Sequence, residues 1–259
     1  MLSIYISRKF LERNLLFAKS KLLSRFIYNN YGDVKDDSNF LEIERKFLFN
    51  ESDDLDKKLV KIGAEKIQNK YILDEYFDIQ SNYMLLNTFL LRKRTICNKY
   101  SKWQLKYPTK ENLINQSEIY YELNETSSIQ KFIQNKLSVD FNGDFEDMIQ
   151  EMNFKCFAPI SYKRQSYLIK EMDLKVDLDQ TDFSYTVGEI ESLKRSDYKK
   201  SISDINILTN LLSLNNNQNI PGKLSAYLYR RRPDLFYLLL NKDIISQSVN
   251  EKLNKFFIK

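Results

Sequence analysis

The segment Glu42-Ile43-Glu44-Arg45-Lys46-Phe47 has the two-residue period of a β-strand. Since successive side chains of a strand point to opposite faces, Glu42, Glu44 and Lys46 share one face. A strand face that carries two acids and a lysine is unusual. Taken alone, it is most typical of a sheet face turned to bulk water, so the neighbouring segments decide its meaning.

Several later segments repeat this alternation. Runs rich in Ile, Val, Tyr and Phe, or in strict alternation, predict strands at residues 41–49, 70–78, 89–96, 101–108, 117–124, 161–169, 173–180 and 185–194. Their charged faces carry Arg92 and Arg94; Gln104 and Lys106; Glu118, Tyr120 and Glu122; Lys175, Asp177 and Asp179; and Glu189 and Glu191. A flat sheet and a closed barrel with charged faces inward both satisfy this pattern. Because some whole strands carry acids on this face and other whole strands carry bases, the pattern indicates a bound ligand.

Helices are predicted between the strands. One runs from a Ser52 cap to Gly63, a residue type that commonly ends helices. Apolar spacing and capping place others near 126–137, 144–153, 197–213 and 223–241. We expect one domain at 39–245, an N-terminal extension at 1–38 and a C-terminal tail at 246–259.

Composition excludes several kinds of active site. The 259 residues contain no histidine, which excludes Ser-His-Asp catalysis, His-liganded zinc and imidazole acid–base chemistry. The net charge of +5 comes from 40 Lys and Arg against 35 Asp and Glu, too even a mixture to indicate a nucleic-acid partner. Cys97 and Cys156 are isolated, which is typical of a reducing compartment. No apolar run is long enough to cross a bilayer, so we expect no membrane partner.

A polyphosphate is a ligand that needs both kinds of charged face. Its oxygens bind Arg and Lys, whereas a divalent cation that bridges those oxygens binds carboxylates. Carboxylates gathered without a cation repel one another, by roughly 4 kcal/mol at about 4 Å and an effective dielectric near 20. The residues therefore predict a basic wall that faces an acidic wall, with Mg²⁺ or Mn²⁺ at the acids.

These segments resemble the CYTH superfamily, whose ExExK signature matches Glu42, Glu44 and Lys46. The similarity runs in order over about 40–240 and is strongest to the thiamine triphosphatase branch. It includes Asp74 to Asp78, Leu91 to Arg94, Trp103 to Lys106, Val176 to Glu191, Lys223-Leu224, Tyr227-Leu228 and Arg230 to Pro233. The resemblance implies an α+β fold: a closed antiparallel eight-stranded β-barrel of the triphosphate-tunnel type, with helices packed outside.

The resemblance also implies roles for individual residues. The metal would be bound by Glu42, Glu44, Asp177, Glu189 and Glu191, with Asp179 as a weaker candidate. The substrate would be bound by Lys46, Arg92, Arg94, Lys106, Glu122, Arg164 and Lys223. Glu189, Glu191 and Lys46 would be catalytic. Trp103, Tyr76 and Phe183 are expected in the core outside the barrel.

Hydrolysis of a triphosphate is the activity that the resemblance implies. Either a carboxylate or the metal would orient and deprotonate the attacking water. Thiamine triphosphate is the expected substrate and inorganic tripolyphosphate the alternative, since Leu90, next to Phe89, stands where mammalian thiamine triphosphatases carry a tryptophan. A non-catalytic polyphosphate-binding module and a purely structural β-protein are the hypotheses from other classes.

The first 38 residues are basic, contain serine and carry one acid, Glu12, before the Asp-rich stretch that precedes the first strand. This pattern is typical of a mitochondrial transit peptide, and an untidy N-terminal extension fits it equally. We therefore expect a location in the cytoplasm or the mitochondrial matrix. The partner expected is a small-molecule triphosphate, and the chain is expected to be a monomer.

Overall fold

The computed structural model describes residues 40–50, 54–114, 117–192, 198–214 and 219–258. The expected extension at 1–38 and the predicted Ser52 cap lie outside these residues. The strands are β1 Phe40–Phe47, β2 Glu65–Asp78, β3 Leu90–Ile96, β4 Tyr100–Ile114, β5 Ser117–Leu123, β6 Lys155–Ile169, β7 Leu174–Thr181 and β8 Thr186–Ser192. The helices are α2 Leu55–Lys61, α3 Tyr83–Leu86, α4 Thr126–Leu137, α5 Phe145–Glu151, α6 Tyr198–Leu211, α7 Lys223–Arg231, α8 Pro233–Asn241 and α9 Gln247–Phe257, with a 3₁₀ turn at Lys170–Met172.

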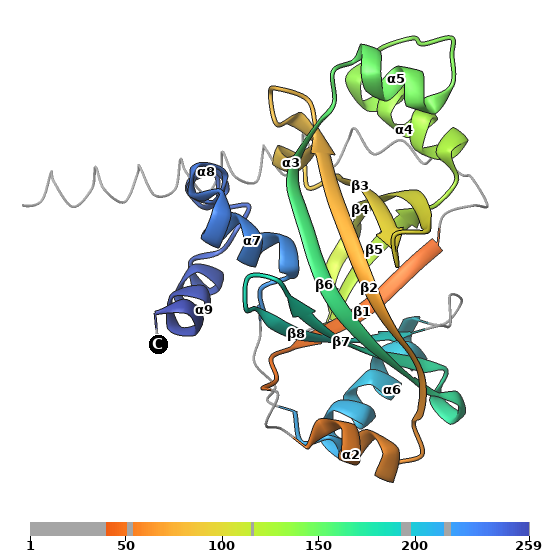
Figure 1. Cartoon of the computed structure of the whole chain (residues 1–259), viewed down its shortest axis with the longest axis vertical. Coiled ribbons are helices and arrows are strands. Elements are labelled where there is room, and N and C mark those ends of the chain that lie inside the picture. The colour runs from red at the N-terminus through yellow and green to blue at the C-terminus, as the bar shows by residue number, and fades with distance from the viewer. Residues whose placement is uncertain (1–39, 51–53, 115–116, 193–197, 215–218, 259) are drawn as a thin grey trace, which may run out of the picture. The chain divides into compact units, whose positions relative to one another are not determined.

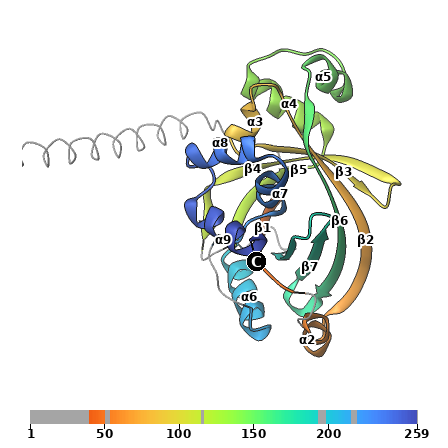
Figure 2. The same cartoon turned by 60° about the vertical axis from the view of Figure 1, so that its left-hand side comes forward.

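The strands form one closed antiparallel barrel in the order β1-β5-β4-β3-β2-β6-β7-β8 (Figures 1 and 2). The barrel closes at β1, where Glu44 lies opposite both Glu118 of β5 and Glu191 of β8. Closure pairs every described strand on both sides, so that none of them presents a free edge. The predicted eight-stranded barrel is confirmed, and the flat sheet is excluded.

The C-terminal helices differ from the single helix predicted at 223–241. That helix breaks at Arg232, whose φ of −137° and ψ of 62° are not helical. The break follows from Pro233, because its ring disfavours the helical conformation of the preceding residue. The stretch expected as a tail contains α9, whose Leu253 is buried. No described helix is both long and apolar enough to span a bilayer.

Helices cover the outer faces of the strands. The side chains of Ile43, Val176 and Ile190 point away from the barrel interior and form one buried cluster with Ile205 and Leu208 of α6. On another side, α5 packs on β4 through the rings of Phe145 and Trp103, whose centroids are 5.3 Å apart. Trp103 therefore lies in the outer core, as predicted.

Helices α7, α8 and α9 cover a part of the barrel where inward-facing positions are apolar. Tyr76, Ile160 and Val187 belong to the same buried cluster as Leu228 and Leu239 of these helices. Both views show the three helices on the side away from the turn between β3 and β4 (Figures 1 and 2). The prediction that Tyr76 lies outside the barrel is wrong, since its side chain lines the internal cavity.

Gly188 provides a test of how β1 and β8 pack. It lies opposite Phe47, and a Cβ atom at Gly188 would overlap the Phe47 ring. We expect Gly188→Ala to lower the free energy of unfolding by about 1–3 kcal/mol, because the ring must leave its place. The change is measured as a drop in Tm. Gly222→Ala is the control, since a Cβ there would meet no heavy atom closer than Lys46 Cε at 3.4 Å. Equal Tm values for the two variants would contradict this packing.

Candidate active site

The inward faces of the strands enclose a cavity of about 550 Å³. Charged residues from seven strands and from the start of α7 line it. They are Glu42, Glu44 and Lys46 of β1, Arg92 and Arg94 of β3, Lys102 and Lys106 of β4, Glu118 and Glu122 of β5, Arg164 of β6, Lys175 of β7, Glu189 and Glu191 of β8, and Lys223 of α7. The cavity thus gathers every residue predicted for the site except Asp177 and the weaker candidate Asp179.

Asp177 and Asp179 lie behind the cavity wall and bind its basic residues. Asp177 Oδ2 accepts a hydrogen bond from Arg164 Nη1 at 2.6 Å, and its Oδ1 accepts one from Ser166 Oγ at 2.6 Å. Asp179 accepts two hydrogen bonds from Arg164, at 2.7 and 2.6 Å, and forms an ion pair with Lys223 at 2.6 Å. Both aspartates therefore orient basic groups instead of facing the cavity.

The basic side of the cavity is built on Asp74, which is not among the residues predicted for the site. Arg94 donates to both oxygens of Asp74, from Nε at 2.6 Å and from Nη2 at 2.7 Å, and Tyr162 donates its hydroxyl at 3.0 Å. Arg94 and Arg92 outweigh the effect of burial and hold the pKa of Asp74 well below its usual range. Strand alternation gives Asp74 and Tyr76 the same orientation, but it does not show which face of β2 points into the barrel.

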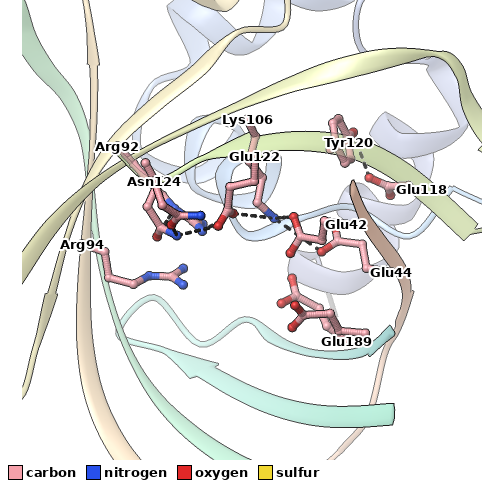
Figure 3. A network of polar contacts seen from close by, with 12 residues as sticks. Glu42, Glu44, Arg92, Arg94, Lys106, Glu118, Tyr120, Glu122, Asn124 and Glu189 are labelled. Carbon is pink, nitrogen blue, oxygen red and sulfur yellow. Dashed lines mark hydrogen bonds and ion pairs between the residues drawn. The ribbon is translucent and has the colours of Figure 1, made fainter. Parts of the chain in front are cut away.

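Arg92 belongs to a chain of hydrogen bonds across β3, β4 and β5. Its Nε donates to Gln104 Oε1 at 3.2 Å, and Gln104 Nε2 donates to Glu122 Oε1 at 2.7 Å and to Asn124 Oδ1 at 2.9 Å. The chain fixes the guanidinium before any ligand binds. Figure 3 shows Arg92 and Arg94 on one side of the cavity and Glu42, Glu44 and Glu189 on the other. The two arginines of β3 thus lie opposite these glutamates, as predicted, whereas Lys46, Lys106 and Lys223 lie among the glutamates and pair with them.

On the acidic side, three carboxylates share the ammonium group of Lys106. Glu42 lies against Lys106 Nζ, while Glu44 and Glu122 lie 3.6 and 3.9 Å from it. Burial, together with the charges of Glu44 and Glu122, raises the pKa of Glu42 to about 7 despite Lys106. Burial acts on Glu44 as well, but Lys106 and Lys46 outweigh it and lower the pKa of Glu44 to about 2.

Glu189 occupies the middle of another set of ion pairs. Lys223 Nζ donates to its Oε1 at 2.8 Å, and Arg164 Nη2 donates to its Oε2 at 3.1 Å. These cations and Lys46 outweigh burial and hold the pKa of Glu189 well below its usual range. Glu189 is therefore ionised at neutral pH. Glu191 is more exposed, at 26%, and forms an ion pair with Lys175 at 2.5 Å.

The carboxylates predicted to bind a metal are turned toward cations. Within the described part of the chain, no three Asp, Glu or Cys side chains converge in the manner of a metal site. Glu42 stands apart, because its Oε2 is buried and accepts no hydrogen bond of good geometry even with Lys106 close by. The four glutamates could supply oxygen ligands to a metal, but in this structure they form ion pairs with lysines and an arginine.

Another part of the cavity wall is apolar. Leu85, Leu90, Leu228 and Ile245 line it together with Tyr76. Phe89 does not face the cavity, since its ring packs edge-on against Phe132 of α4 at 5.1 Å. The aromatic ring absent at position 90 is therefore not supplied by its neighbour.

Comparison with known proteins agrees with this geometry. The chain matches the CYTH domain over residues 41–217. Thiamine-triphosphatases of Macaca fascicularis and Homo sapiens are each 27% identical to it over 211 residues, which cover 77% of this chain and 89% of each relative. A solved putative adenylyl cyclase from Hippeastrum, described as having a dominant triphosphatase activity, aligns with a TM-score of 0.51 and 16% identity over 73% of this chain and 96% of that chain. That structural likeness shows the fold alone.

The residues that match the CYTH domain include strands β2 to β8, nearly all of β1 and every cavity residue of the two charged walls except Lys223. The match covers well over half of the chain. The chain belongs to the CYTH domain family.

Proposed function

We propose that this chain hydrolyses thiamine triphosphate to thiamine diphosphate and phosphate, with the help of a divalent metal ion. The observation that carries the proposal is one barrel cavity lined both by basic groups of β3, β4 and α7 and by carboxylates of β1 and β8. The names of the two mammalian relatives support the choice of substrate.

In this proposal the triphosphate is bound by Lys46, Arg92, Arg94, Lys106, Arg164 and Lys223. Their side chains are at most 13% exposed, so their attraction to phosphate oxygens is screened far less than in water. Catalysis of phosphoryl transfer depends mainly on positioning and on stabilising charge. The ion pairs hold these groups in place before the substrate arrives, and Glu122 positions Arg92 through Gln104.

The carboxylates of β1 and β8 supply the oxygen ligands that a divalent cation such as Mg²⁺ prefers. Glu44 lies directly opposite Glu191 in the strand register, and Glu189 follows on the same face of β8. The raised pKa of Glu42 is the effect of burial and crowded carboxylates, which a bound cation would reverse. We assign Mg²⁺, or Mn²⁺, to these four glutamates. Such an ion supplies neutralising charge to the phosphate oxygens.

Asp177 fits the metal less well than the four glutamates. Arg164 and Ser166 already bind both of its oxygens, and its side chain is 2% exposed. We therefore propose that it positions Arg164 against the substrate.

Hydrolysis requires a water molecule to attack the terminal phosphorus in line with the leaving diphosphate oxygen. Glu189 is ionised and can accept a hydrogen bond from this water, which would orient it. Glu191 is the second carboxylate able to do so. Lys46 donates to Glu44 and lies 2.8 Å from Glu118, which hold its ammonium group in place. Because Lys46 lines the cavity, its charge would stabilise the phosphate as the bond breaks.

Inorganic tripolyphosphate is a second candidate substrate, and Leu90 is the observation that favours it. A ring at this position would stack on the cationic thiazolium of thiamine, a contact worth about 1–2 kcal/mol. Leu90 cannot make that contact, and tripolyphosphate does not need it. Among the described lining residues, Tyr76 and Tyr120 are the rings in the cavity.

The acidic wall is tested with Glu44→Gln and Glu191→Gln. We expect each variant to lose at least about 100-fold in kcat, because a carboxylate that neutralises the site is gone while the shape is kept. Phosphate release from thiamine triphosphate with Mg²⁺ measures the effect, and EDTA should abolish release by the parent protein. Glu65→Gln, at an exposed glutamate of β2, is the matched control. Full activity in Glu44→Gln or Glu191→Gln would refute the assignment, and substrate binding without any release would favour a non-catalytic module.

Glu42 is tested through stability. A group whose pKa is raised by folding stabilises the protein below its unfolded pKa of 4.5, and that stability is lost as pH rises through about 7. Glutamine mimics the protonated acid, so Glu42→Gln should be more stable than the parent by about 1–3 kcal/mol at pH 8 and by much less at pH 5. Tm values in EDTA across this range measure the difference. Mn²⁺ should raise the Tm of the parent at pH 8 more than that of the variant. A variant less stable than the parent at pH 8 would contradict the crowding of these carboxylates.

Leu90→Trp tests substrate choice. Since the contact with thiazolium is worth about 1–2 kcal/mol, we expect the ratio of kcat/KM for thiamine triphosphate over tripolyphosphate to rise about 5- to 30-fold. Leu90→Met is the control for a change of shape without a ring. An unchanged ratio in the tryptophan variant would place the organic group elsewhere in the cavity.

A further inference from the structure

Lys102 of β4 lines the cavity without a carboxylate partner. Its Nζ donates to Asn124 Oδ1 at 3.3 Å, and no carboxylate oxygen of the described residues lies within 4.0 Å of it. Each of the other lysines and arginines that line the cavity has at least one carboxylate within that distance. An anion can therefore bind Lys102 without breaking an ion pair.

The strand register places Lys102 beyond the basic groups assigned to the triphosphate. On β4, Lys106 lies opposite Leu90, Gln104 opposite Arg92, and Lys102 opposite Arg94. Lys102 and Lys106 are four positions apart, which is about 13 Å along a strand. Lys102 is thus the cavity cation of β4 nearest in the chain to the turn between β3 and β4. That turn lies on the side of the barrel away from α7, α8 and α9 (Figures 1 and 2).

Three cations, Lys102, Arg92 and Arg94, are accompanied by two carboxylates, Asp74 and Glu122. Arg92 and Arg94 share Asp74, and Glu122 is engaged by Arg92, Gln104 and Lys106. Burial lowers the pKa of Lys102, and the charges of Arg94, Arg92 and Lys175 lower it further against the pull of Glu122. Crowded cations of this kind are relieved by a bound anion.

This part of the cavity also opens to solvent. The side chains of Lys175 and Glu191 are each 26% exposed, whereas those of Lys46, Arg92 and Lys223 are 7–9% exposed. A linear ligand can extend outward here, past the basic groups that bind three phosphates. At the apolar wall under α7, α8 and α9 such an extension would meet leucine and isoleucine side chains.

We propose that Lys102 binds an additional phosphate group, so that the cavity accepts linear inorganic polyphosphates of four or more phosphates. This inference rests on the proposed function, because it places the first three phosphates among the basic residues assigned there. Lys102 is then a residue that determines chain-length specificity.

The test compares the binding of tripolyphosphate and tetrapolyphosphate to the full chain by titration calorimetry in EDTA. A charge-assisted contact of typical strength should make tetrapolyphosphate bind about tenfold more tightly than tripolyphosphate. Lys102→Gln should raise the Kd of tetrapolyphosphate about tenfold and that of tripolyphosphate less than about threefold. Lys102→Arg should retain the preference. Lys99→Gln is the control, since it removes an exposed positive charge three residues away and should change neither Kd. It distinguishes a direct contact of Lys102 with phosphate from long-range electrostatic attraction.

Equal changes in both Kd values for Lys102→Gln, or no change in either, would overturn the inference. Phosphate release by the parent protein from thiamine triphosphate or tripolyphosphate with Mg²⁺ is measured in parallel. If release is found and the Kd values do not separate, the chain-length subsite is wrong while the hydrolase proposal stands. If the parent protein releases no phosphate from either substrate, the proposed hydrolase function is wrong, whatever the Kd values.

Discussion

The pairing of buried charges inside the barrel is the constraint on which the rest of this structure depends. Moving a charged group out of water costs several kcal/mol unless an opposite charge and hydrogen bonds replace the water. Asp74, at 1% exposure, meets this requirement through the fork of Arg94, and Asp179, fully buried, meets it through Arg164 and Lys223. Each pair joins different strands or helix α7, so the network also fixes how these elements lie around the cavity.

Stability alone does not require such a network, because well-packed apolar residues of similar volume often give a folded protein the same or greater stability. Its value lies in holding groups in place for a ligand that is itself highly charged. Aspartates that do not line the cavity hold the basic groups in place, whereas the glutamates line the cavity itself. This division between Asp177 and Asp179, which orient, and Glu189 and Glu191, which face the cavity, gives the site its preorganised charge.

The cavity is also asymmetric along its length. Helices α7, α8 and α9 cover an apolar part lined by Tyr76 and Leu228, while Arg94 and Lys102, near the β3–β4 turn, make another part basic. The first part suits an organic group and the second a phosphate chain. The same barrel interior thus offers two kinds of environment, because inward positions on a strand change from apolar to charged within a few residues.

Much of this site can be predicted from local pattern. The two-residue period assigns Glu42, Glu44, Arg92, Arg94, Lys106, Glu189 and Glu191 to common strand faces, and the absence of histidine excludes imidazole chemistry throughout the chain. Strand period says which side chains share a face, but not which strands meet or how far apart two inward groups lie. Asp74 and Tyr76 illustrate this, since their inward direction is visible in β2 only once β2 is known to lie beside β3.

The sequence by itself determined the alternation of charged and apolar strand faces, the segregation of acids from bases and the kind of ligand that such charges bind, because these follow from local geometry and composition. The tertiary structure alone decided that the charged faces converge in one cavity, that Asp177 binds Arg164, and that Lys102 has no carboxylate partner. Those facts depend on barrel closure and strand register, which bring together residues far apart in the chain.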